Sequence, residues 1–327
     1  MSKPPYRQPR MNTLQVTVTK KSIEAQDIAS FELTLPEGAL PRFSAGSHID
    51  VHAPNGSIRQ YSLCNDPSES HRYQIAVLRD PGSRGGSVAM HDLVHEGDRL
   101  TISEPRNHFP LVPGQRFLLF AGGIGITPIL CMAERLAAIG AEFELHYCAR
   151  SPERTAFRER IASASFAGRV HFHFDTDPAS HLDCAAALGG PQPGAHIYTC
   201  GPSGFIDFVT GTARANGWPD AQIHVEYFGA AVPLVTDGDA GFEVELASTG
   251  ARYQVGPEES VVAALARHGI EIEVSCEQGV CGTCITRVLK GDVDHRDSYF
   301  TDDEKAANDQ FTPCCSRARS SCLVLDL

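Results

Sequence analysis

The stretch CEQGVCGTC, from Cys276 to Cys284, is the most informative part of this 327-residue chain. Its three cysteines have the spacing C-x4-C-x2-C, and a fourth cysteine, Cys314, follows after 29 further residues. This spacing matches the plant-type ligand pattern of a [2Fe–2S] cluster. Gly279 and Gly282 allow the backbone to turn tightly around such a cluster. The stretch therefore predicts an iron–sulfur module at the C-terminal end.

Two alternatives remain open from the spacing alone. Four cysteines also hold structural zinc, although a zinc ribbon usually has two C-x2-C pairs and this stretch has only one. Cys314 is followed directly by Cys315, and the spacing permits either residue as the fourth ligand.

Charge separates this C-terminal part from the rest of the chain. The formal net charge is −12, which disfavours nucleic acid and anionic membranes as main partners because both repel a negative protein. Residues 235–327 contain 17 acidic and 8 basic residues, and so carry −9 of that charge. We expect a separate acidic module there, and the length predicts two or three domains in all.

The N-terminal residues MSKPPYRQPRMN are polar and rich in proline. They lack the apolar run of a signal peptide, and no stretch of the chain reaches the 18–20 apolar residues of a membrane span. We therefore expect a cytoplasmic protein whose 11 cysteines are reduced thiols or metal ligands.

Hydrophobic periodicity divides the preceding residues into two further parts. Between residue 14 and about residue 110, apolar residues recur at period two in short segments separated by turn residues, which predicts a small antiparallel barrel. These segments are Leu14–Lys20, Ala29–Leu35, Ser47–Ala53 and Arg72–Leu78, with a helix expected at Ser87–Val94.

From Arg116 onward, apolar strands alternate with helices, which predicts right-handed βαβ units and a parallel sheet. The strands are Arg116–Gly123, Phe143–Arg150, Val170–Asp175 and His196–Gly201, and the helices are Thr127–Gly140, Thr155–Ala162 and 202–216. The expected organisation is a flexible tail at 1–11, a barrel at 12–112, an α/β domain at 113–231, a linker at 232–241 and the cysteine module at 242–327.

Two motifs in the barrel suit a phosphate-bearing cofactor. The strand RQYSLCND begins at Arg59, and RGGS (Arg84–Ser87) opens the expected helix. Glycines before a helix leave backbone N–H groups free to bind a phosphate, and Arg59 can add a charge-assisted hydrogen bond. Taken alone, R-x-Y-S equally suits an ordinary half-buried strand.

The segment LLFAGGIGITPIL (Leu118–Leu130) has the strand–turn–helix layout of a dinucleotide site, with Thr127 as the expected N-cap and Pro128 at the first helical position. It is not the strict G-x-G-x-x-G motif. The next strand ends in Arg150 rather than in an acid, and Arg150 or Arg154 suits a 2′-phosphate. A second loop, TCGPSGF (Thr199–Phe205), lies at a strand end, where α/β sheets bind ligands.

Together these motifs resemble the phthalate dioxygenase reductase family, which includes vanillate O-demethylase reductases. The segment DHRDSYFTDDEK (Asp294–Lys305) and the sequence CCSRA from Cys314 add to the likeness, which spans residues 12–327. The resemblance implies three modules in order: an antiparallel flavin-binding β-barrel, a parallel α/β nicotinamide-binding domain of the ferredoxin reductase kind, and a plant-type ferredoxin β-grasp domain.

The resemblance also implies roles for individual residues. The family's C-x-S-R-A pattern selects Cys314 over Cys315, so the expected cluster ligands are Cys276, Cys281, Cys284 and Cys314. Ser62, Cys200 and Glu226 are expected at the reacting atoms, with Ser62 near flavin N5 and Cys200 beside nicotinamide C4. The residues expected to bind flavin or coenzyme are Arg59, Tyr61, Ser62, Arg84, Gly85, Gly86, Ser87, Gly122, Gly123, Gly125, Thr127, Pro128, Arg150, Cys200, Gly201, Pro202 and Phe228.

The implied function is electron transfer. The resemblance indicates that the chain takes a hydride from NADH onto FMN, with FAD the less favoured flavin, and passes single electrons through the [2Fe–2S] cluster. The implied acceptor is a Rieske-type non-haem iron oxygenase, docked through a basic surface, and the chain is expected to be a monomer. The alternatives are a self-contained NAD(P)H diaphorase and a non-enzymatic redox-sensing or zinc-binding protein. The sequence does not identify the oxygenase substrate or decide firmly between NADH and NADPH.

Overall fold

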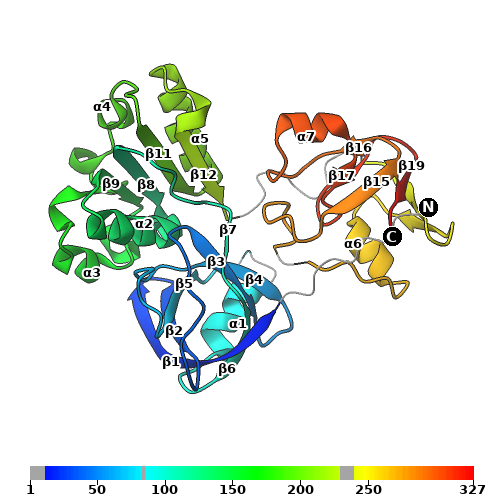
Figure 1. Ribbon diagram of the computed structural model, residues 1–327, viewed down its shortest axis with the longest axis horizontal. Coiled ribbons are helices and arrows are strands. Elements are labelled where there is room, and N and C mark those ends of the chain that lie inside the picture. The colour runs from blue at the N-terminus through cyan, green and yellow to red at the C-terminus, as the bar shows by residue number, and fades with distance from the viewer. Residues whose placement is uncertain (1–11, 81, 83–84, 229–238, 275) are drawn as a thin grey trace. The chain divides into compact units, whose positions relative to one another are not determined.

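The computed structural model describes residues 12–327 except 81, 83, 84, 229–238 and 275. Arg84, most of the expected linker and the whole of the expected tail therefore lie outside the described residues. The described residues form two compact units, one within residues 12–228 and one within residues 239–327 (Figure 1).

The first unit begins with an antiparallel sheet in which the strands follow the order β4-β3-β6-β1-β2-β5, while β7 pairs with β3. A bridge between Leu63 and Ile75 joins the end of β4 to β5, so the two outer strands meet and the sheet closes as a barrel. The predicted barrel is confirmed. Its strands are β1 (Thr13–Ala25), β2 (Ile28–Thr34), β3 (Ser47–His52), β4 (Ile58–Ser62), β5 (Tyr73–Leu78), β6 (Arg99–Ser103) and β7 (Arg106–Asn107).

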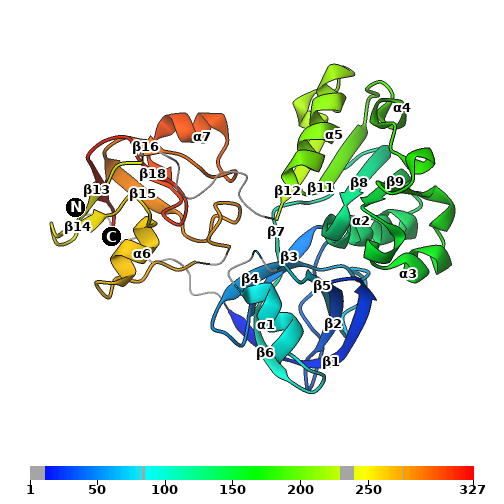
Figure 2. The ribbon, with the colours of Figure 1, turned by 180° about the vertical axis from the view of Figure 1, so that it is seen from behind.

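The barrel is filled by alternate side chains of its strands and closed by helix α1 (Gly86–Leu93). Ala89, Met90 and Val94, in or just after this helix, pack against the barrel core, and both ribbon views show the helix beside the strands (Figure 2). Because Gly85 adopts the left-handed conformation (φ 84°), the chain turns sharply into the helix there.

The rest of this unit is built on a five-stranded, wholly parallel sheet of order β10-β9-β8-β11-β12. The central strand, β8, is an almost unbroken apolar run because helices cover both of its faces. The predicted parallel α/β domain is confirmed. The strands are β8 (Arg116–Gly122), β9 (Glu142–Ala149), β10 (Val170–Phe174), β11 (Ala195–Gly201) and β12 (Ile223–Tyr227).

The helices divide between the two faces of this sheet. Helix α2 packs against Phe117 and Leu119, whereas α4 and α5 pack against Leu118 and Phe120. The helices are α2 (Ile126–Ala138), α3 (Arg158–Ser163), α4 (Cys184–Leu188) and α5 (Ser203–Ala215), with single 3-10 turns η1 (Gly123–Gly125), η2 (Pro152–Arg154), η3 (Ala167–Arg169), η4 (Pro178–Ser180) and η5 (Asp220–Gln222). The cluster around α2 also includes Ile28 and Phe109, so the barrel and the parallel sheet share one core.

Two helix starts differ from expectation. Thr127 is not the N-cap of α2, because the helix begins at Ile126 after Gly125, and the Thr127 hydroxyl donates to the Ile124 carbonyl at 3.1 Å. Helix α3 begins at Arg158 rather than Thr155, because Phe157 adopts a left-handed conformation (φ 62°) directly before it.

The second unit has a five-stranded mixed sheet of order β14-β13-β19-β15-β17, with β13 and β19 parallel, and a separate pair β16-β18. Helix α6 packs Val261, Ala264 and Leu265 into the same core as the sheet. The elements are β13 (Phe242–Leu246), β14 (Arg252–Val255), α6 (Val261–Ala266), β15 (Thr286–Lys290), β16 (Val293–Asp294), α7 (Asp302–Ala307), β17 (Gln310–Phe311), β18 (Arg317–Ala318) and β19 (Cys322–Leu325).

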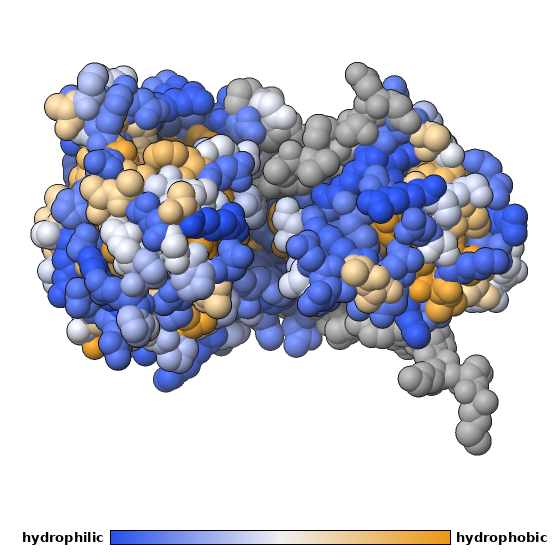
Figure 3. Space-filling view, turned by 90° about the horizontal axis from the view of Figure 1, so that it is seen from above, coloured by the Kyte–Doolittle hydropathy of each residue, from blue (hydrophilic) through white to orange (hydrophobic). Residues whose placement is uncertain are grey.

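The visible surface is mostly hydrophilic, with hydrophobic residues dispersed over it (Figure 3). Phe208 and Phe228 are among the few large apolar side chains that are at least 40% exposed. In the part of the chain that the structure describes, no helix is long and apolar enough to cross a membrane.

Candidate functional site

The cysteine loop brings four buried thiols together. Cys276, Cys281, Cys284 and Cys314 are each at most 6% exposed. Side-chain hydrogen bonds link Cys276 to Cys281 and to Cys314, and Cys314 to Cys284. Among the described residues, no group of three or more His, Cys, Asp or Glu side chains is arranged to hold a single metal ion. A [2Fe–2S] cluster does not need that arrangement, since each iron takes two cysteines.

The loop backbone is shaped around these sulfurs. Gly282 adopts a left-handed conformation (φ 71°), and a Cβ atom there would lie only 2.4 Å from the Tyr299 ring. The backbone N–H groups of Gln278 and Thr283 donate to the sulfurs of Cys276 and Cys281 at 3.3 and 3.4 Å. Amide donors beside thiolates are typical of iron–sulfur sites, where they stabilise the negative sulfurs. The residues present therefore fit a [2Fe–2S] cluster.

Cys314 and Cys315 lie in different surroundings. The Cys314 thiol contacts Cys276 and Cys284 as well as Cys315, whereas the Cys315 sulfur lies 3.2 Å from Thr312 Oγ1. Cys315 also fills the space beside Gly279, where a Cβ atom would come within 2.4 Å of its sulfur. This geometry favours Cys314 as the fourth ligand, with Cys315 packed behind it.

In the first unit, a cavity of about 640 Å³ opens at the carboxyl ends of the parallel strands. Gly122 lines it from the end of β8 and Gly123 from the turn that follows, while Arg150 and Pro202 line it from the turns after β9 and β11. The 3-10 turn η1 runs directly into helix α2 and starts at these glycines without a side-chain cap, so the first amides of η1 can bind an anion. The cavity has the position and the donors of a dinucleotide site.

The sequence analysis missed Asp175 as a residue of this cavity. It follows β10, the edge strand, and lines the cavity together with Arg150 and Arg154. Arg154 lies 3.5 Å from Asp27 in an ion pair. The signal for it is present in the sequence, because an acid, Asp175, directly follows the strand VHFHF.

Gly125 packs closely against the backbone of Cys200. A Cβ atom at Gly125 would lie 2.2 Å from the Cys200 carbonyl oxygen, so only glycine allows this turn to approach β11. The Cys200 side chain is fully buried, and this burial, with a smaller contribution from Glu226, raises the pKa of the thiol well above its usual value. Cys200 is therefore a neutral thiol at physiological pH.

Ser62 and Glu226 meet although 164 residues separate them. The Ser62 hydroxyl, at the end of β4, donates to Glu226 Oε2, on β12, at 3.4 Å. Glu226 as a whole residue is only partly buried, but its carboxyl group is desolvated, which raises its pKa to about 8 despite the opposing hydrogen bond from Ser62. The structure thus brings together Ser62, Glu226 and Cys200, the three residues expected at the reacting atoms.

A second cradle lies at the start of α1. A Cβ atom at Gly86 would come within 2.9 Å of the Arg59 side chain and of the Ser57 hydroxyl, so the backbone here approaches both closely. Further along β4, the Tyr61 hydroxyl is buried without a hydrogen-bond partner among the described residues. A glycine cradle beside an arginine, with an unpartnered buried hydroxyl on the same strand, fits a phosphate-bearing aromatic cofactor.

Not every expected residue enters these sites. The Ser87 hydroxyl lies 3.2 Å from the Asp80 amide, and Arg79 forms an ion pair with Asp92. Phe228 is 40% exposed at the end of this unit.

Comparisons with known proteins agree with this geometry. Residues 244–319 match the family described as the 2Fe-2S iron-sulfur cluster binding domain. The chain is 58% identical over 316 residues to a vanillate O-demethylase oxidoreductase of Pseudomonas putida, covering 96% of this chain and 100% of the relative. It is 42% identical over 318 residues to the phthalate dioxygenase reductase of Burkholderia cepacia, covering 96% and 97% of the two chains.

A solved structure of a phthalate dioxygenase reductase superposes with a TM-score of 0.77 at 41% identity, covering 96% of this chain and 98% of that one. The chain therefore belongs to the family of vanillate O-demethylase oxidoreductases and phthalate dioxygenase reductases, and it is an oxidoreductase with a C-terminal [2Fe–2S] domain.

Proposed function

We propose that this chain is the NADH-dependent reductase component of a Rieske-type oxygenase system, with FMN in its first unit and a [2Fe–2S] cluster in its second. The observation that carries the proposal is the meeting of Ser62, Glu226 and Cys200 in the first unit. The same unit holds a cavity of about 640 Å³ at the carboxyl ends of its parallel strands, and the chain also carries the four-cysteine loop. The related phthalate dioxygenase reductase is described as a modular structure for electron transfer from pyridine nucleotides to a [2Fe–2S] centre, which supports the same path here.

The flavin is assigned to the cradle at α1. Gly85 and Gly86 would offer backbone amides to its phosphate, Arg59 would pair with the same anion, and Tyr61 would flank the ring. When bound, FMN supplies the chemistry that converts a two-electron hydride donor into a one-electron donor. The choice of FMN over FAD rests on the family.

Asp175 supports NADH as the coenzyme. A carboxylate at the adenosine end of a dinucleotide site accepts a hydrogen bond from the ribose 2′-hydroxyl and repels a 2′-phosphate. Arg150 and Arg154 would instead attract a 2′-phosphate, but Arg154 is already paired with Asp27. Asp175 therefore favours the unphosphorylated coenzyme.

The residues expected at the reacting atoms have distinct tasks. With a pKa of about 8, Glu226 holds a proton at neutral pH and presents an uncharged carboxyl group to the site. Ser62 orients that carboxyl through its hydroxyl. Cys200 adds an uncharged thiol, so the site stays free of fixed negative charge where the nicotinamide would lie.

The names of the relatives support the oxygenase partner. They include vanillate O-demethylase oxidoreductase, phthalate dioxygenase reductase and the reductase subunit of a tert-butanol monooxygenase from Aquincola tertiaricarbonis. Those names cover different substrates, as expected for a component that delivers electrons and never binds the oxidised molecule.

The test separates the two halves of the electron path. We expect Cys281→Ser to abolish electron transfer from NADH to the oxygenase component, while NADH-dependent reduction of ferricyanide, which takes electrons from the flavin, continues. Retention of oxygenase-coupled turnover in the variant would remove Cys281 from the path. Product formation by the purified chain without any oxygenase would favour a self-contained reductase instead.

A further inference from the structure

The segment from Asp294 to Phe300 braces both parts of the chain that carry the cluster cysteines. On one side, the Ser298 amide donates to the Gly279 carbonyl at 3.0 Å, and the Tyr299 ring packs against Gly282. On the other side, Ser316, two residues after Cys314, donates its hydroxyl hydrogen to Asp297 at 3.2 Å. This brace lies directly behind the ligand loop, and the function proposed above gives it no role.

Asp297 is the buried centre of the brace. Its side chain has no exposed surface, and four donors point at its carboxylate. Ser316 Oγ and His295 Nδ1 lie 3.2 Å from Oδ1, and the amides of Tyr299 and Phe300 lie 3.2 and 2.9 Å from Oδ2. Because backbone amides can only donate, this arrangement suits an ionised carboxylate.

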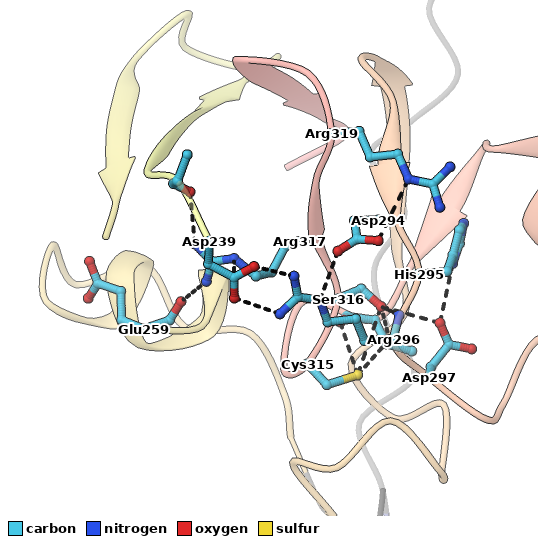
Figure 4. Close-up of polar contacts among 12 residues, drawn as sticks. Asp239, Glu259, Asp294, His295, Arg296, Asp297, Cys315, Ser316, Arg317 and Arg319 are labelled. Atoms are coloured by element: carbon cyan, nitrogen blue, oxygen red, sulfur yellow. Dashed lines mark hydrogen bonds and ion pairs between the residues drawn. The ribbon is translucent and has the colours of Figure 1, made fainter. Parts of the chain in front are cut away.

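The neighbouring charges leave that carboxylate as a local anion. Arg296, next to it in sequence, instead binds Asp239 and Asp294 (Figure 4). Lys305 donates to the main-chain carbonyl of Asp297 at 2.8 Å. In the described part of the chain, the only ionisable side chain hydrogen-bonded to the carboxylate itself is His295.

The negative charge also sets the direction of a hydrogen-bond chain that ends beside Cys314. Since the hydrogen of Ser316 goes to Asp297, Ser316 Oγ accepts from the Arg296 amide at 3.1 Å and from the Thr312 hydroxyl at 2.9 Å. Thr312 has then used its only hydrogen, so its hydroxyl oxygen can only accept from the Cys315 sulfur, which lies 3.2 Å away. Figure 4 shows Ser316 at the junction of Asp297, Arg296 and Cys315.

We propose that Asp297 is a positioning residue of the [2Fe–2S] site, whose buried carboxylate holds the Cys314 turn against the Gly279 loop and lowers the reduction potential of the cluster. A fixed negative charge within a poorly solvated surrounding disfavours the addition of an electron to a nearby centre. This inference rests on the [2Fe–2S] assignment of the proposed function.

The test is the midpoint potential of the cluster in the full chain with its cofactors, followed by electron paramagnetic resonance during a mediated reductive titration. Asp297→Asn keeps the shape of the side chain and removes its charge. We expect a more positive potential, so that at the wild-type midpoint more than half of the clusters in the variant are reduced. Asp303→Asn, which removes an equal charge from an exposed position in α7, should leave the midpoint unchanged. A midpoint in Asp297→Asn equal to that of wild type would overturn the proposal.

Ser316→Ala decides the question if Asp297→Asn does not retain its cluster. This variant keeps the charge but removes a donor that partly neutralises it, so we expect a more negative potential. An unchanged or more positive potential would contradict the role given to Asp297.

Chemical reduction makes the titration independent of NADH and of the oxygenase. Failure of NADH to reduce a chain that shows the cluster signal would therefore overturn the proposed function alone. Absence of any cluster signal from the wild-type chain would overturn both.

Discussion

The carboxyl group of Glu226 illustrates how a single residue takes its chemistry from its surroundings. In water a glutamate is ionised at neutral pH, but here desolvation raises the pKa to about 8. The opposing hydrogen bond from Ser62 is too weak to reverse this shift. The same side chain in an exposed position, such as Glu37, has no such surroundings.

The raised pKa predicts how stability depends on pH. The folded chain keeps the Glu226 proton that the unfolded chain releases above about pH 4.5, so this contribution to stability is full below that pH and is lost as pH rises through 8. Glu226→Gln cannot lose a proton. We expect its stability relative to wild type to increase from pH 5 to pH 8 in urea unfolding of the flavin-free chain. Glu37→Gln is the control, and an equal pH trend in both variants would contradict the assignment.

The carboxylate of Asp175 leads to a prediction about the choice between NADH and NADPH. Asp175→Asn removes the charge that repels a 2′-phosphate and leaves Arg150 and Arg154 in the cavity. We expect kcat/KM for NADH to fall by about tenfold, the effect of losing roughly 1.4 kcal/mol of a charged hydrogen bond, and kcat/KM for NADPH to rise. Steady-state ferricyanide reduction with each coenzyme measures both. An unchanged ratio would show that Asp175 does not face the ribose.

At the scale of elements, the nucleotide site depends on the close approach of the turn after β8 to the end of β11. Gly125 stands at that contact and also precedes the first turn of α2. Its conformation (φ −60°) is open to any residue, so the requirement for glycine comes from the close approach of the peptide group between Cys200 and Gly201. Steric exclusion between two backbones cannot be relieved by a rotamer change.

We therefore expect Gly125→Ala to destabilise the first unit by about 3 kcal/mol or more, as overpacking against fixed atoms does, and to raise KM for NADH. Gly211→Ala is the matched control, because Gly211 is exposed in α5 with nothing near its missing Cβ atom. It should stabilise the protein by about 0.5–1 kcal/mol through its better helix propensity. Chemical denaturation of both variants measures the difference. Equal effects would show that the contact at Cys200 is not decisive.

At the scale of the whole molecule, charge and cofactor sites are distributed together. The residues from 235 onward hold both the cysteine loop and a net charge of −9. Part of that charge is exposed, as in α7, where Asp302, Asp303 and Glu304 occupy the first turn. An acidic electron-exit module suits a basic docking surface on the acceptor, with association accelerated by long-range attraction.

This distribution of charge predicts that salt slows electron transfer to the oxygenase but not the earlier steps. We expect the rate of electron transfer to the oxygenase at subsaturating concentrations to fall steeply as ionic strength rises from about 0.01 to 0.15 M, over which the screening length shortens from about 30 to 8 Å. Reduction of an uncharged small acceptor by the flavin should change little over the same range. A rate of transfer to the oxygenase that is constant or rises with salt would exclude a basic docking surface.

The sequence by itself determined what depends on neighbouring residues. The C-x4-C-x2-C spacing identified the iron–sulfur module, and the change from period two to alternating strands and helices separated the barrel from the parallel sheet. These signals are readable because a cluster loop and a strand are shaped by contiguous residues.

The tertiary structure decided what depends on packing between distant segments. Only the fold places the Ser62 hydroxyl within hydrogen-bond distance of Glu226 and makes Asp175 line the cavity of the first unit. Only the fold packs Gly125 against the Cys200 carbonyl and buries the Asp297 side chain near the cysteine loop. The physical reason is that desolvation, steric exclusion and the direction of hydrogen bonds arise only when segments far apart in the chain come into contact.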